Sequence, residues 1–125
     1  MLRTTKNICL LLMVLLFTSS IAFAGPEMPA KIKKEFSQYP GSTVMHTMDS
    51  PIMTQVILDC GSESIDAVYS YYKKKAVGNG WTVQMENKSA DVYNLMLKNG
   101  DKGGMIAVGS EKGEIAATLS IMSQK

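Results

Sequence analysis

A histidine and several methionines lie close together in the first part of the chain that is predicted to be extended. They are Met45, His46, Met48 and Met53. Thioether sulfur and imidazole nitrogen are ligands that suit Cu(I). In a strand, His46 and Met48 share one face while Met45 points to the other, and Met53 joins them only if the next strand pairs alongside. Methionine is also an adaptable core residue. The sequence therefore leaves a copper site and simple apolar packing both open, and it assigns no metal ligand.

The residue types needed for catalysis form no recognisable pattern. His46 is the only histidine, so any Ser–His or Cys–His pair must use it, and no serine stands in a G-x-S-x-G motif. One histidine and two cysteines are too few for a Cys₄, Cys₂His₂ or His₃ zinc site. The acidic residues are scattered and no two are singled out as a pair, which leaves a small hydrolase only as a third hypothesis. We predict a non-enzymatic protein with no catalytic residue and no cofactor.

Residues 1–24 have the three parts of a secretory signal peptide. Arg3 and Lys6 give a positive start, residues 8–17 are an uncharged apolar run, and residues 22–24 (AFA) form a small-x-small cleavage site. No second apolar run of about 18 residues follows, as a membrane-spanning helix would need. We therefore predict a soluble periplasmic or secreted protein that begins at Gly25 and has no stable membrane insertion after cleavage.

The predicted mature chain has balanced charge, with eleven lysines and eleven acidic residues. This balance excludes nucleic-acid binding driven by bulk attraction to phosphates. The chain divides into an arm or short helix over residues 25–38 and a single domain over residues 39–125. Cys60 is the one cysteine beyond the signal peptide. It is either a small buried apolar residue or an exposed thiol that joins two copies in a dimer or links the chain to a partner.

One helix is strongly indicated after residue 63. The hydroxyl of Ser64 can accept a hydrogen bond from an unpaired N–H of the first turn. Apolar residues then follow at helical spacing, at Ile65, Val68, Tyr69, Tyr72 and Ala76. Gly78 or Gly80 can end the helix in a left-handed conformation. A shorter helix is predicted within residues 30–38, with Ile32 and Phe36 on one face.

Alternating apolar residues and turn signals predict six strands. They are residues 43–48, 52–59, 81–85, 91–98, 104–110 and 115–122. The order is β-β-α-β-β-β-β, and the short connections after the helix make neighbouring strands antiparallel. The prediction is an α+β fold in which an antiparallel sheet of about six strands packs on one main helix. A single helical layer covers one face, so the other face is left for water, a ligand or a partner.

Several short motifs recur as a set in one group of proteins. They are Tyr39-Pro40-Gly41, Tyr71-Tyr72-Lys73-Lys74-Lys75 and Gly80-Trp81. The set resembles small exported bacterial domains of unknown function that carry a "YPG…FYKKxL…GW" signature, and the match spans residues 36–122. The resemblance implies export and the fold class, and it transfers no catalytic residue. Trp81 is expected to be the large side chain that anchors the helix to the sheet.

These observations favour a binding or interaction module over an enzyme. The predicted partner is a protein or a small apolar ligand, held either in a groove between sheet and helix or on the uncovered face of the sheet. The alternative is a periplasmic copper-binding protein that uses the Met/His cluster.

Overall fold

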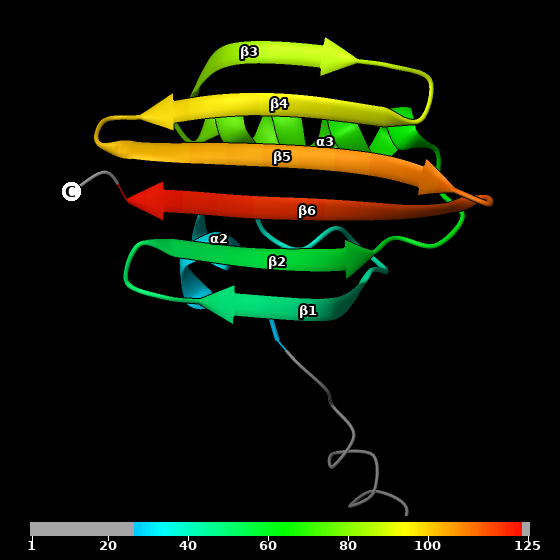
Figure 1. Cartoon of the computed structure of the whole chain (residues 1–125), viewed down its shortest axis with the longest axis horizontal. Coiled ribbons are helices and arrows are strands. Elements are labelled where there is room, and N and C mark those ends of the chain that lie inside the picture. Colours follow the sequence, from blue (N-terminus) through cyan, green and yellow to red (C-terminus); the bar gives the residue numbers. More distant parts are fainter. Residues whose placement is uncertain (1–26, 124–125) are drawn as a thin grey trace, which may run out of the picture.

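The computed structural model describes residues 27–123, which form a six-stranded sheet and two helices (Figure 1). The helices are α2 (Ala30–Glu35) and α3 (Ile65–Gly78). The strands are β1 (Thr43–Asp49), β2 (Met53–Asp59), β3 (Thr82–Lys88), β4 (Val92–Asn99), β5 (Lys102–Glu111) and β6 (Glu114–Ser123). The α+β class and the predicted order β-β-α-β-β-β-β are confirmed. The predicted signal peptide, residues 1–24, lies outside the described residues.

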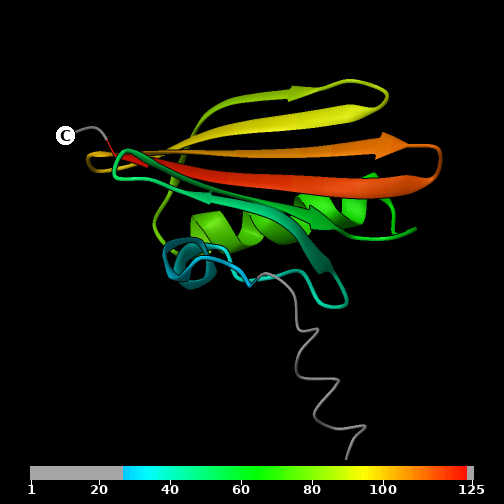
Figure 2. The same cartoon turned by 60° about the horizontal axis from the view of Figure 1, so that its bottom comes forward.

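The strands lie side by side in the order β1-β2-β6-β5-β4-β3, and every neighbouring pair is antiparallel. The last strand, β6, runs through the middle of the sheet and joins the β1–β2 hairpin to the strands that follow α3. Figures 1 and 2 show both helices on the same side of the sheet, with α3 against β3, β4 and β5 and α2 against β2 and β6. No described helix is long and apolar enough to span a bilayer.

Helix α3 begins and ends where its local sequence predicts. The Ala67 N–H donates to the Ser64 side-chain oxygen at 3.0 Å, which satisfies one unpaired donor of the first turn. The apolar stripe faces the sheet, and Val68, Tyr72 and Ala76 are fully buried. After the helix, Gly80 has a φ of 92°, a conformation that favours glycine. The stripe drives the helix onto the sheet, since burying a large apolar side chain stabilises a fold by roughly 1.5–3 kcal/mol.

Trp81 anchors the main helix, α3, to the sheet, as predicted, and it also contacts the α2 segment. Its side chain is only 3% exposed, and its indole nitrogen donates to Glu35 Oε1 at 2.9 Å. The indole ring lies 5.5 Å from the Phe36 ring, measured between centroids. On its other side it lies against Gly104 of β5, where there is no side chain to hold it off. The indole therefore fills the space where α2, the end of α3 and β5 meet.

Helix α2 is part of the same core. Ile32 and Phe36 have no exposed surface, and Met28, just before the helix, is 7% exposed. The hydroxyl of Tyr72 on α3 donates to the Ser37 carbonyl at 3.1 Å, so the end of the α2 segment is also tied to α3. The segment predicted as an arm or short helix thus contributes buried side chains to the domain.

Apolar side chains alternate along the strands and point toward the helices. In β6 the buried apolar residues are Ile115, Ala117, Leu119 and Ile121, the set predicted to share one face, and Ser120 is also buried. In β4, Leu95 and Leu97 are buried while Met96 between them is 42% exposed. Because successive side chains of a strand point to opposite faces, each strand presents a second set of residues to the side without helices.

Both edge strands are irregular. The pairing of β1 with β2 shifts between Val44 and His46, and the pairing of β3 with β4 shifts between Val83 and Met85. Each shift places an extra residue in the edge strand, which is a β-bulge. Bulges increase the local twist and interrupt the ladder at the edge of a sheet.

Candidate functional site

The side of the sheet that carries no helix is the candidate site, and we call it the open face (Figure 2). Its residues are those that alternate with the buried ones on each strand. It holds seven of the eight methionines that follow residue 24, and the eighth, Met28, lies in the core. The seven are Met45, Met48, Met53, Met85, Met96, Met105 and Met122. Such a concentration of one flexible, apolar residue type is the main chemical feature of this face.

Three of these methionines form a row across neighbouring strands, which we call the thioether row. Met85 of β3 is directly opposite Met96 of β4, and Met96 is directly opposite Met105 of β5. Side chains directly opposite in antiparallel strands have Cβ atoms about 4.5–5.5 Å apart. Met85 is 58% exposed and Met96 is 42% exposed, so both residues are accessible from solvent.

The register extends the same row to the other edge of the sheet. Met105 is opposite Ser120 of β6, Ser120 is opposite Gln55 of β2, and Gln55 is opposite Met48 of β1. The Ser120 hydroxyl donates to Gln55 Oε1 at 3.2 Å, which satisfies two polar groups in the middle of the row. This row therefore crosses all six strands without a lysine, arginine or carboxylate.

The charged residues of the open face lie at its two ends. Lys98 stands at one end, two residues along β4 from Met96. Asp59, Glu111 and Glu114 stand at the opposite end, as the pairings of β2, β5 and β6 require. The centre of the face is thus apolar or uncharged, with charges confined to its rim, which is the arrangement found in many protein interfaces.

The predicted Met/His cluster is only partly assembled. His46, Met48 and Met53 all lie on the open face, but they are opposite Ile57, Gln55 and Met122, respectively, and not opposite one another. The expectation that Met45 points to the other face is wrong. Met45 is the extra residue of the β1 bulge, is 56% exposed, and lines a shallow hollow on the open face together with Asp59 and Ala116. The bulge breaks the simple alternation on which the expectation rested.

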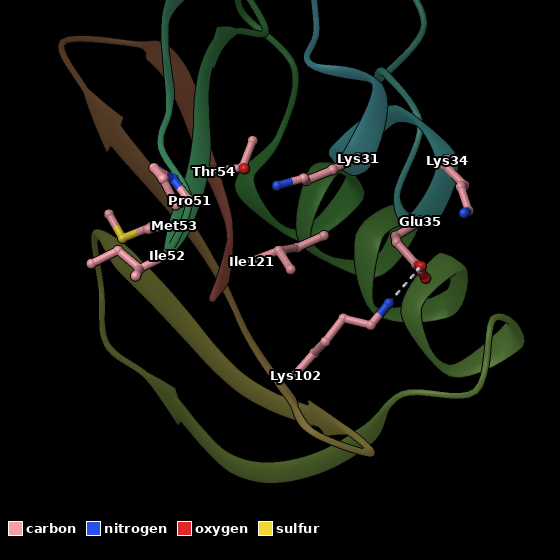
Figure 3. Close-up of a pocket in the computed structure, with 9 residues that line it drawn as sticks. All are labelled: Lys31, Lys34, Glu35, Pro51, Ile52, Met53, Thr54, Lys102 and Ile121. Atoms are coloured by element: carbon pink, nitrogen blue, oxygen red, sulfur yellow. Dashed lines mark ion pairs between the residues drawn. The ribbon is translucent and has the colours of Figure 1, made fainter. Parts of the chain in front are cut away.

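A separate cleft lies beside α2, where the β1–β2 turn and the start of β5 approach the helix (Figure 3). Its volume is about 260 Å³, and its lining combines apolar residues such as Ile52 and Ile121 with three lysines. The lysines are Lys31, Lys34 and Lys102. Lys102 lies 3.5 Å from Glu35 and Lys31 lies 3.9 Å from Asp49, measured between charged atoms. These ion pairs offset much of the positive charge that would attract an anionic ligand.

One cluster of titratable residues, around Glu86, lies on the covered side of the sheet. The Tyr69 hydroxyl donates to Glu86 Oε2, and the Lys73 ammonium donates to the same oxygen at 2.9 Å. These hydrogen bonds, first that of Tyr69 and then that of Lys73, lower the pKa of Glu86. Lys88 lies over the Tyr69 ring at 5.2 Å and over the Tyr93 ring at 5.1 Å. This cluster joins the exposed edge of α3 to β3.

Cys60 is buried at the end of β2, with 6% of its surface exposed. Burial and, next, the charge of Asp59 raise the pKa of the Cys60 thiol to about 11. The thiol is therefore protonated at neutral pH, a state that is a poor nucleophile. This agrees with the interpretation of Cys60 as a small apolar residue, and a dimer through Cys60 stays a prediction.

Sequence reasoning missed the thioether row. The residues of β4 (VYNLMLKN) and β5 (KGGMIAVGSE) alternate clearly, but the alternation gives no register between the two strands. Among the described residues, no group of three or more His, Cys, Asp or Glu side chains could hold a metal ion. Comparisons with protein-family models, curated proteins and solved structures find no match for this chain.

Proposed function

We propose that this protein is an exported, non-enzymatic binding module that holds an apolar segment of a partner protein on its open face. The observation that carries the proposal is the gathering of seven methionines on the uncovered side of the sheet. Methionine side chains are flexible and polarizable, and they are common on surfaces that bind varied apolar segments. Export rests on the signal-peptide pattern of residues 1–24.

The size of the face suits a protein partner better than a small ligand. Six strands about 4.8 Å apart and about seven residues long cover roughly 29 by 23 Å, or about 700 Å². A standard protein interface buries about 800 Å² on each partner. A small apolar ligand requires a concave site that surrounds it, whereas the hollow beside Met45 is bounded mainly by the β5–β6 turn and stays open to solvent.

The shape of the sheet favours contact through the face and not through an edge. A partner strand that extends the sheet needs a regular row of free N–H and C=O groups at an edge. The bulges at Val44/His46 in β1 and Val83/Met85 in β3 interrupt that row at both edges. The charged rim formed by Lys98 at one end and Asp59 at the other would set the orientation of the partner.

The proposal can be tested by site-specific photo-crosslinking in the producing organism. A photoreactive phenylalanine analogue is introduced at Met96 on the open face or, as the control, at Val77 of α3, which is 53% exposed. We expect a discrete heterologous crosslinked product from position 96 and none from position 77. The partner is then identified by mass spectrometry, purified and titrated against the purified protein by calorimetry.

The titration uses matched charge insertions. Met96→Lys combined with Met105→Lys is expected to weaken binding at least tenfold, since it introduces unpaired charges at the centre of the interface. Val77→Lys is expected to leave the affinity unchanged. Equal crosslinking from both positions, a crosslink to a second copy of this chain, or a small apolar molecule retained on the face in native mass spectra would each overturn the proposal.

A further inference from the structure

The thioether row offers a ligand set that is independent of a protein partner. Met85, Met96 and Met105 come from three adjacent strands, and each is directly opposite the next. None of them fills the core, because their strand neighbours Leu95, Leu97 and Ile106 do so. Three methionine side chains on adjacent strands therefore lie on the side of the sheet away from the core.

We propose that the thioether row binds one Cu(I) ion through the sulfur atoms of Met85, Met96 and Met105. Thioether sulfur is a soft, neutral ligand and selects Cu(I) over harder cations such as Mg²⁺ or Ca²⁺. A thioether does not need to lose a proton to bind a metal, unlike a thiol or an imidazolium ion. The site thus requires no titratable group.

The geometry permits the three sulfur atoms to converge. Adjacent strands lie about 4.8 Å apart, so Met85 and Met105 stand one strand to either side of Met96. Methionine has three rotatable side-chain bonds. The outer two side chains can lean toward Met96 while the sheet backbone stays in place, and Met85 and Met96, at 58% and 42% exposure, have the freedom to do so.

The other sulfur and nitrogen groups of the open face form less complete sets. Met53 and Met122 are directly opposite each other, which gives two thioethers and no third in the same row. His46 and Met48 share the outer side of β1 but are two residues apart along the strand. A site built on them would use the imidazole nitrogen of His46, which binds a metal only when it carries no proton.

The test is an anaerobic titration of the purified protein with Cu(I), in competition with a chromophoric Cu(I) chelator. The row variant carries Met85→Leu, Met96→Leu and Met105→Leu, and the control variant carries Met48→Leu and Met53→Leu. Leucine conserves side-chain volume and apolar character, so both variants are expected to keep the fold, as circular dichroism can verify. Both variants also keep an apolar open face, so they remove thioether ligands without removing the proposed surface for the partner protein. Failure of copper binding and failure of partner binding can therefore be distinguished.

We expect one Cu(I) per protein at micromolar free metal, at least a tenfold loss of affinity in the row variant, and no change in the control variant. Affinity should be the same at about pH 5.5 and about pH 7.5, because no ligand of the row titrates in that range. In methyl NMR spectra, Ag(I), a redox-stable substitute for Cu(I), should shift the signals of the three row methionines first.

Three outcomes would overturn the assignment. One is the absence of bound Cu(I) at micromolar free metal. Another is loss of binding in the Met48/Met53 control variant with retention in the row variant. The last is an affinity that falls at low pH and disappears on His46→Ala, which would move the copper site to β1.

Discussion

The contact between Trp81 and Gly104 gives the sharpest prediction about stability. A Cβ atom built on Gly104 would lie 2.8 Å from Trp81 Cζ3 and 3.3 Å from two further ring carbons. The indole has little freedom to move, since its nitrogen donates a hydrogen bond to Glu35 and its ring packs against Phe36. The substitution Gly104→Ala should therefore force the indole or the β5 backbone to shift.

The expected cost follows from two opposing terms. Overpacking a buried site typically destabilises a fold by about 1–3 kcal/mol. Replacing a strand glycine by alanine stabilises it by about 0.5–1 kcal/mol, because alanine loses less backbone freedom on folding. A net loss of about 1–2 kcal/mol remains. For a domain of this size each kcal/mol corresponds to about 4–8 °C, so Tm should fall by roughly 5–15 °C in differential scanning calorimetry.

A matched control lies on the same strand. A Cβ on Gly109 would meet only ordinary contacts, 3.7 Å to the Asp91 carbonyl oxygen, so Gly109→Ala should not lower stability by more than about 0.5 kcal/mol. In a Trp81→Phe background the cost of Gly104→Ala should shrink, because the clashing ring carbons are gone. Equal losses for the two alanine variants, or an undiminished loss in the Trp81→Phe background, would refute the packing argument.

Three further measurements follow from the structure. The Cys60 thiol, whose pKa burial raises to about 11, should react with a thiol reagent at about pH 8 only after denaturation, and stoichiometric labelling of the native protein would contradict its burial. The pKa of Glu86 is lowered, first by the hydrogen bond from Tyr69, so the stability lost in Glu86→Gln should be present at neutral pH and vanish as the pH falls through that lowered pKa. Urea denaturation of the wild type and of Glu86→Gln from about pH 7 to about pH 3 measures how the difference in their free energy of unfolding changes with pH. A difference that stays constant would exclude the Glu86 carboxylate as its cause. Mild peroxide should convert Met85 to its sulfoxide before Met28, as peptide mass spectrometry can follow, because Met85 is 58% exposed and Met28 is 7% exposed.

The elements that could be predicted from sequence are those defined by local chemistry. Helix α3 has its cap at Ser64, its stripe through Val68 and Tyr72, and its end before Gly80, all within one segment. The strands could be found because alternation is also local. At the β5–β6 turn, Lys112 and Gly113 both take positive φ values, as a two-residue hairpin loop requires.

The candidate site could be predicted only in part, because it depends on contacts between distant segments. Alternation in β4 indicates that Met96 is on the outer side, but only the pairing with β3 and β5 brings Met85 and Met105 beside it. The insertion of β6 in the middle of the sheet likewise has no local signal, since it is decided by which strands bury their apolar faces together. The wrong expectation for Met45 came from a bulge, and its sequence contains no glycine or proline that would mark one.

The bulges in β1 and β3 have a consequence for how the molecule behaves at high concentration. In a sheet with a broad apolar face and two regular edge strands, the edge strands of one copy can pair with those of the next. Such growth leads to fibres. Here the outermost strand on each side is kinked at Val44/His46 or Val83/Met85, so backbone-to-backbone growth would have to straighten the kink first. The bulges therefore oppose edge-to-edge polymerisation while the open face stays apolar.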